Sequence, residues 1–221
     1  MRKRDSIRTT SVRIANREVL LHPGRVVFLP DQSLLVCSDI HVGKTDHFRR
    51  HGIPVPRMAA MANAWRLAEV MESLAPSHVL FLGDLMHSSA NREWEEFVDM
   101  LDQFPGLKRT LVKGNHDVEG ESFFIHHGFE VAHEWTDGFF RFVHVPEAKP
   151  KEGFHTFAGH LHPAVRMVGP ARQSLRLPCF WLGENQSILP AFGEFTGHVL
   201  VRPLPGDRIY VVAENEVIGV T

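Results

Sequence analysis

The sequence predicts an α/β protein in which two β-sheets pack together with helices outside them. Two observations carry this prediction. Between residues 34 and 127, short apolar runs alternate with helical patterns, which is typical of a parallel sheet covered by helices. From residue 129 onward, short strand patterns follow one another with turns between them. Because the 221 residues contain no repeat or low-complexity segment, we expect one domain over residues 1–221.

Residues 12–38 have the pattern of β-structure, with apolar runs separated by turn-forming residues. The expected strands cover 12–21, 25–29 and 34–38. The last run is short and continuously apolar, so we expect it to be a buried strand. The segment 43–56 that follows contains two glycines and two prolines, and we expect an irregular loop there.

Three segments have apolar residues at helical spacing. They cover 57–74, 91–104 and 120–127, and buried strands are expected between them at 77–82 and 109–112. In the first helix, apolar residues that include Met58 and Trp65 occupy two faces, so we expect it to be well buried. The remaining expected strands cover 129–135, 139–145, 156–158, 164–168, 177–182, 187–189, 198–202 and 208–212.

Composition excludes several classes of protein. The net charge of −2 is not the footprint of a strong nucleic-acid binder. No apolar run is long enough to span a bilayer, and no apolar signal core follows the basic residues 2–4, so we expect a cytoplasmic protein without a membrane partner. Cys37 and Cys179 lie in apolar runs and are expected to be buried thiols. The count of 15 histidines is unusually high, and metal binding is the commonest functional reason for such an excess.

Five apolar runs end in residues that can bind metal ions. These endings are Asp39-Ile40-His41, Gly83-Asp84, Gly114-Asn115-His116-Asp117, His144 and Gly159-His160-Leu161-His162. In an extended chain Asp39 and His41 would point the same way. The glycines suit sharp turns that let the backbone approach a ligand. One such ending arises by chance, but five in order indicate a metal centre, because buried carboxylates and imidazoles without partners are costly.

This ordered set resembles the calcineurin-like metallophosphoesterases, whose pattern is D-x-H, G-D, G-N-H-[D/E], H and G-H-x-H. The resemblance implies a four-layer α/β/β/α sandwich that binds two divalent metal ions at the strand ends. It implies Asp39, His41 and His162 as ligands of the first metal, Asn115, His144 and His160 as ligands of the second, and Asp84 as the bridge between them. His144 is the least typical position, because Val145 follows it where many family members have glycine.

The same resemblance implies roles for two residues that would not bind metal. His116 would stabilise charge in the transition state or protonate the leaving oxygen. Asp117 would orient the His116 imidazole, as a carboxylate orients other catalytic histidines. We expect manganese as the metal, although iron and zinc also suit mixed nitrogen and oxygen ligands.

Other stretches resemble one bacterial subgroup, the ligase-associated DNA damage response endonucleases. These stretches are Gly43-Lys44, Phe48-Arg49, 52–56, 177–181 and 189–197. The resemblance implies hydrolysis of DNA phosphodiester bonds by a metal-bridging hydroxide, with DNA as a partner and a DNA ligase and helicase as candidate partners. The candidates for substrate contacts are Lys44, Arg49, Arg50, His87 and Arg166.

Two alternatives stay open. A small-molecule phosphodiesterase or phosphatase is compatible with the motifs, because one fold serves many substrates. A non-catalytic scaffold is also conceivable, but it would have no need for His116 together with seven intact metal ligands. The histidines outside the five motifs are expected to be surface or structural residues, with His87 as the exception because it follows Asp84 closely.

Overall fold

The computed structural model describes residues 7–87, 89–169 and 173–220. The helices in these ranges are α1 (Lys44–Arg50), α2 (Arg57–Leu74), α3 (Arg92–Asp102) and α4 (Glu121–His126), with a short 3-10 turn η1 (Pro30–Gln32). No helix in the described part of the chain is long and apolar enough to cross a membrane.

The first sheet contains seven strands that lie side by side in the order of the sequence. They are β1 (Thr10–Ile14), β2 (Arg17–His22), β3 (Val26–Leu29), β4 (Leu34–Cys37), β5 (His78–Leu82), β6 (Lys108–Val112) and β7 (Glu130–Ala132). The pairs from β1 to β4 are antiparallel, whereas β4, β5, β6 and β7 run parallel. The carboxyl ends of β4, β5 and β6 therefore meet at one edge of the sheet, and the polar motifs begin there.

The second sheet contains nine strands, of which seven follow the order β14-β11-β12-β13-β10-β9-β8 while β15 pairs with β12 and β16 with β15. They are β8 (Trp135–Thr136), β9 (Phe140–Val143), β10 (His155–Ala158), β11 (Pro163–Val168), β12 (Ser174–Leu182), β13 (Gln186–Ile188), β14 (Val199–Leu200), β15 (Arg208–Ala213) and β16 (Glu216–Gly219). The parallel strands β9 and β10 end in the motifs that contain His144 and His160.

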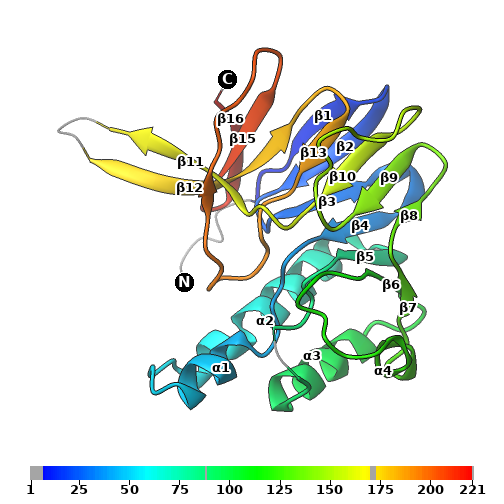
Figure 1. Ribbon diagram of the computed structural model, residues 1–221, viewed down its shortest axis with the longest axis vertical. Coiled ribbons are helices and arrows are strands. Elements are labelled where there is room, and N and C mark those ends of the chain that lie inside the picture. Colours follow the sequence, from blue (N-terminus) through cyan, green and yellow to red (C-terminus); the bar gives the residue numbers. More distant parts are fainter. Residues whose placement is uncertain (1–6, 88, 170–172, 221) are drawn as a thin grey trace.

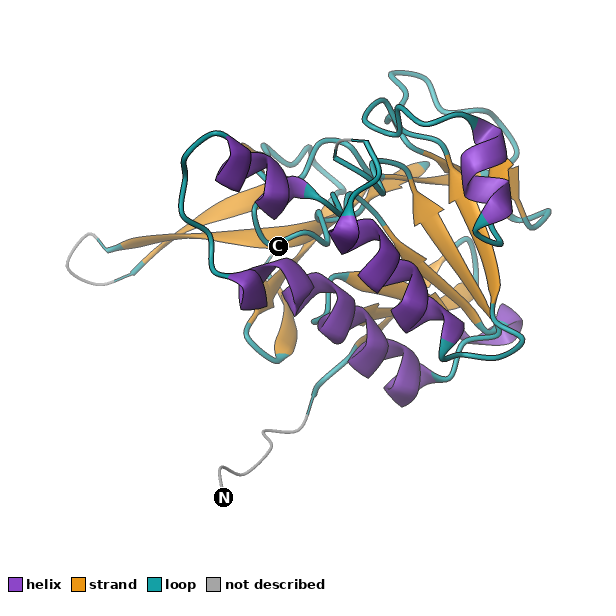
Figure 2. Ribbon diagram, turned by 90° about the horizontal axis from the view of Figure 1, so that it is seen from below, coloured by secondary structure: helices purple, strands orange, loops and turns teal. Residues whose placement is uncertain are grey.

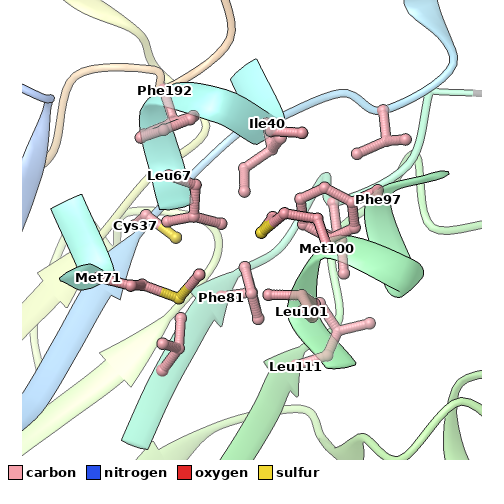
Figure 3. Packing of buried hydrophobic residues seen from close by; sticks show 14 of the residues in the cluster. Cys37, Ile40, Leu67, Met71, Phe81, Phe97, Met100, Leu101, Leu111 and Phe192 are labelled. Carbon is pink, nitrogen blue, oxygen red and sulfur yellow. The ribbon is translucent and has the colours of Figure 1, made fainter. Parts of the chain in front are cut away.

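Two hydrophobic cores hold the layers together. The core between the sheets joins residues such as Val36 and Leu80 to Phe142 and Phe157. The other core lies between the first sheet and the helices, and Figure 3 shows it extending from Leu111 to Ile40 and Phe192. Ile40 sits between the predicted ligands Asp39 and His41, so helix packing fixes the backbone of the first motif.

The predicted α/β class with two packed sheets is confirmed, and the helices cover the outer face of the first sheet (Figures 1 and 2). The helical layer expected over the second sheet is not seen among residues 127–169 and 173–220. A small apolar cluster around Cys179, Ile209 and Val211 lies there instead. The described chain therefore has an α/β/β arrangement.

Three local predictions were wrong or incomplete. The segment expected to be an irregular loop contains α1, because residues 44–50 between its breakers include no glycine or proline. The strand expected over 12–21 is a hairpin that turns at Ala15 and Asn16, both with positive φ. On α2, Met58 is 72% exposed and Trp65 49% exposed, since a different face of the helix packs on the sheet.

Candidate metal centre

Loops at the strand ends hold the predicted ligands in strained backbone conformations. Asp39, His41, Asp84, His160 and His162 all have a left-handed backbone, with φ between 48° and 66°. The side chains of Asp39 and His41 therefore converge through a turn rather than through an extended strand. Such conformations cost of order 1–3 kcal/mol each and persist where the surroundings fix them, as at functional sites.

The backbone of the β4 loop is tied to the β5 loop. The Asp39 N–H donates to Gly83 O at 3.2 Å, and the His41 N–H donates to Asp84 O at 3.0 Å. These bonds place the first motif directly beside Asp84. The two strand ends therefore act as one rigid support.

The glycines of the motifs make room for ligand side chains. A Cβ at Gly159 would lie 1.7 Å from Ser38 Oγ and 2.8 Å from Asp39 Oδ2. A Cβ at Gly114 would lie 2.4 Å from Asp84 Oδ1. Contacts under 3.0 Å are not tolerated, so both positions require glycine for the close approach that the sequence predicted.

The first ligand cluster consists of Asp39, His41 and His162, whose ligand atoms all lie within 4.8 Å of one another. Asp39 Oδ1 and His162 Nε2 face each other at 3.1 Å. His162 Nδ1 donates to the Gly197 carbonyl at 3.0 Å, so its Nε2 is the atom that remains for a metal. Both ring nitrogens of His41 are buried without a hydrogen-bond partner among the described residues.

The protonation of this cluster suits cation binding. Burial lowers the pKa of His41 to about 3, which keeps the imidazole neutral and able to bind metal. Burial alone would raise the pKa of Asp39, but the facing His162 side chain and a hydrogen bond from Ser38 outweigh it and hold the pKa below its usual value. The cluster thus combines a carboxylate with a neutral imidazole in a buried setting.

The second ligand cluster contains Asp84, His144 and His160, whose ligand atoms also lie within 4.8 Å of one another. His144 Nδ1 donates to Leu82 O at 2.8 Å, which leaves Nε2 for a metal. That Nε2 lies 3.1 Å from Asn115 Oδ1 and 3.2 Å from His160 Nδ1. The atypical position His144 therefore joins the cluster, and so does Asn115.

Asp84 lies between the two clusters. Its Oδ1 is 3.3 Å from His144 Nε2, and its Oδ2 is 3.9 Å from His41 Nε2. The seven predicted ligands are thus brought together as two groups that share one carboxylate. Buried nitrogen and oxygen atoms without partners, and acceptors that face one another, fit a pair of divalent cations.

Comparison with known proteins agrees with this geometry. The model of the calcineurin-like phosphoesterase family matches residues 33–183. The chain belongs to the calcineurin-like phosphoesterase family. No curated protein is significantly similar to the chain in sequence.

Solved structures give a second comparison for this phosphoesterase. The nuclease MPE of Pseudomonas putida matches with a TM-score of 0.81 and 27% identity, over 96% of this chain and 100% of that one. The phosphoesterase Yfce of E. coli has a TM-score of 0.43 and 14% identity, over 85% of this chain and 97% of that one. A protein of unknown function from Aquifex aeolicus has a TM-score of 0.42 and 16% identity, over 58% of this chain and 78% of that one.

Two further histidines of this phosphoesterase lie next to the ligand clusters. The His116 ring is 5.3 Å from the His41 ring and stacks on the His87 ring at 5.4 Å between centroids. The backbone N–H of His116 donates to Asp84 Oδ1 at 2.9 Å. His116 and His87 therefore both lie beside the first ligand cluster, and their roles in the reaction stay predictions.

Asp117 has different contacts from those expected. Its Oδ1 accepts the Met86 N–H and its Oδ2 accepts the Gly114 N–H, both at 2.9 Å. Burial raises the pKa of this carboxyl to about 6. Asp117 therefore braces the loops after β5 and β6, and it positions His116 through the backbone rather than by orienting the imidazole.

Lys44 and Arg49, two of the candidate phosphate contacts, differ in what surrounds their side chains. Lys44 is half-buried beside the metal centre, where burial lowers its pKa while the charges of Asp84 and Asp39 oppose that shift. Arg49 is occupied, because its guanidinium donates to Val55 O, Thr45 Oγ1 and Glu93 Oε1 at 3.1–3.2 Å. The prediction of Arg49 as a phosphate contact is therefore not supported.

Two arginines remain among the candidates for substrate contacts, Arg50 and Arg166. Arg166 is exposed on β11, beyond His162 in sequence. The side chain of Arg50 lies outside the described residues.

The loop 189–197 supports the first cluster, and sequence reasoning recognised it only as a subgroup feature. Phe192 N donates to Ser38 O at 2.8 Å, and Gly193 N donates to Asp39 O at 3.0 Å. Arg66 in turn donates to Phe192 O. These contacts use backbone atoms, which every residue carries, so only the spacing of the subgroup motif could have indicated them.

Proposed function

We propose that this phosphoesterase hydrolyses phosphodiester bonds in DNA as a metal-dependent endonuclease. The observation that carries the chemistry is the pair of ligand clusters joined by Asp84. The choice of DNA rests on the whole-length similarity to the Pseudomonas putida nuclease. Exposure of Asn115 also fits a substrate larger than the centre itself, because one cluster reaches the protein surface.

The chain's residues have distinct roles in this proposal. Asp39, His41 and His162 would hold one cation, Asn115, His144 and His160 the other, and Asp84 both. When bound, the cations would polarise a phosphoryl oxygen and lower the pKa of a coordinated water.

Two side chains outside the ligand set complete the proposed reaction. The His116 imidazole, half-buried beside the His41 ring, would protonate the leaving oxygen. Lys44 adds positive charge beside both carboxylates, which favours binding of a phosphate group.

Manganese is the proposed metal, and the mixed nitrogen and oxygen ligands also suit iron and zinc. Metal content of protein purified without added metal, measured by mass spectrometry, tests this choice. A DNA ligase and a helicase of one repair pathway are the proposed partners, on the subgroup motifs alone. Pull-down with the purified ligase and helicase tests that proposal, and no retention of either would contradict it.

A substrate panel tests the proposed function. Supercoiled plasmid, linear duplex, single-stranded DNA, bis-p-nitrophenyl phosphate and p-nitrophenyl phosphate are incubated with Mn²⁺-loaded protein, with Asp84→Ala as the inactive control. We expect nicking of DNA and hydrolysis of the diester by the wild type only. Hydrolysis of bis-p-nitrophenyl phosphate or p-nitrophenyl phosphate without any DNA cleavage would favour the small-molecule alternative.

A further inference from the structure

Strands β11 and β12 form a long two-stranded arm that extends away from the second sheet (Figure 1). The metal ligand His162 directly precedes β11. β14 runs parallel to the base of β11, and Val199 N donates to His162 O at 3.1 Å. The arm therefore begins at the first ligand cluster and leads outward from it.

The two faces of the arm differ in character. Val165 and Leu177, which lie opposite each other, pack against the apolar cluster around Cys179. Because side chains alternate along a strand, their neighbours Arg166 and Arg176 lie on the other face. These two arginines are also directly opposite each other, and both are exposed. One face is thus anchored to the protein while the other presents two cations.

A third arginine extends this row. Val201 N donates to Ala164 O at 3.0 Å, so the chain after β14 keeps running beside β11. Continuing that register brings the exposed Arg202 beside Arg166. The row therefore runs from Arg202, in the segment after β14, across Arg166 on β11 to Arg176 on β12.

The row begins close to the metal centre. Val199 N donates to O of the proposed metal ligand His162, and Pro163 pairs with Val199 in the parallel register of β11 and β14. Arg166 lies four residues beyond His162 on one of these two segments, and Arg202 lies three residues beyond Val199 on the other. The row is therefore separated from the first ligand cluster by a short stretch of strand.

These arginines lack the partners that other arginines of the chain have. Arg25, Arg49 and Arg66 each pair with a glutamate. Among residues 7–87, 89–169 and 173–220, no acidic side chain forms an ion pair with the three arginines of the row. Like charges placed directly opposite each other on neighbouring strands repel and are destabilising. An anion from outside the chain would relieve this repulsion between the arginines.

We propose that the row Arg202–Arg166–Arg176 binds the DNA backbone on one side of the scissile phosphate. Arg166 lies four residues beyond His162, about 13 Å along a strand. That separation corresponds to the axial rise of about four base pairs of B-form DNA. Guanidinium groups at this distance suit phosphate oxygens and would set the register of the substrate. The inference rests on the proposed nuclease function.

The test measures DNA binding separately from cleavage. Affinity for a labelled phosphorothioate duplex is followed by fluorescence anisotropy over a range of salt concentrations. The variant is R166A/R176A, the charge-retaining variant is R166K/R176K, and the matched control is K108A/K151A. Lys108 and Lys151 are also exposed, and Lys108 opens β6 at the strand end opposite the metal centre.

We expect R166A/R176A to bind at least about tenfold more weakly, with a salt slope reduced by about 2, since each lost phosphate contact lowers the slope by about 0.9. R166K/R176K should keep most of the affinity, and K108A/K151A should match the wild type. Equal affinities of R166A/R176A and the control would overturn the inference. A wild type that binds through the arginines but never nicks plasmid would contradict the nuclease function and leave the binding surface supported.

Discussion

The two ligand clusters use the same kinds of side chain, yet the fold supports them differently. In the first cluster, Asp39 and His41 are buried and His162 is half-buried, and the loop 189–197, which lies about 150 residues beyond Asp39 in sequence, holds the Asp39 backbone and the His162 ring. In the second cluster, Asp84 and His144 are equally buried and His160 is half-buried, but Asn115 is exposed. The supports there are the nearby strand ends.

The polar atoms of the clusters differ in the same way. His41 has no hydrogen-bond partner for either ring nitrogen among the described residues, whereas His144 contacts Asn115 and His160. A cation relieves more desolvation penalty where buried atoms lack partners. We therefore expect the first site to bind its metal more tightly and the second to exchange it more readily.

The largest effect should come from the residue that belongs to both clusters. Asp84→Ala removes the carboxylate that faces His41 and His144, so both metals should be lost. Diester hydrolysis should fall by more than the roughly 100-fold that loss of an outer partner costs. Metal analysis by mass spectrometry checks this, and two metals retained per chain would rule out Asp84 as the bridge.

A large effect without metal loss is expected at His116. Its ring lies beside His41 but belongs to neither cluster, so His116→Gln should keep both metals. The rate should fall by about 10²–10⁴-fold, most strongly for diesters with poor leaving groups. An equal loss for good and poor leaving groups would show that His116 does not protonate the leaving oxygen.

A selective effect should separate the clusters. Asn115→Ala removes an exposed proposed ligand of the second site, so one tightly held metal should remain and activity should fall by more than the roughly 10–100-fold that loss of an outer partner costs. The matched variant His41→Ala should instead lose the buried first metal. Titration with Mn²⁺ measures both, and equal losses of metal in the two variants would remove the proposed difference between the sites.

The smallest effect should come from a histidine outside both clusters. Burial lowers the pKa of His155 to about 4, below the unfolded value of about 6.5. The contribution of neutral His155 to stability is complete above pH 6.5 and is lost as the pH falls toward 4, because only the unfolded chain takes up the proton.

Urea unfolding in EDTA measures that dependence without metal. His155→Gln should reduce the loss of unfolding free energy between pH 6.5 and 4 by about 1 kcal/mol or more. An unchanged slope would assign the acid sensitivity to other groups, of which His22 and His78 are buried in the same way.

The sequence predicted the strands β4, β5 and β6, and it predicted the seven residues that the structure brings together in two clusters. The helix over residues 57–74 and the strand ends at Asp39, Asp84 and Asn115 follow from apolar periodicity and strong local motifs. Those signals are local, since each of the five motifs follows the end of a buried strand within a few residues.

The remaining features depend on contacts distant in sequence. Tertiary packing decides that Arg49 pairs with Glu93. It also decides that Asp117 accepts two backbone N–H groups. The supporting carbonyls of Leu82 and Gly197 carry no side-chain signal at all. The exposure of Met58 was also unpredictable, because a helix with two apolar faces does not reveal which face the sheet covers.

The most direct test of two metal ions joined by Asp84 is the electron paramagnetic resonance spectrum of the protein loaded with Mn²⁺. Two ions about 3.5–4 Å apart, as in two-metal phosphoesterase sites, should give the spectrum of a spin-coupled pair. We expect that coupled spectrum for the wild type and its absence in Asp84→Ala. Only the six-line signal of isolated Mn²⁺ in the fully loaded wild type would contradict the dinuclear centre.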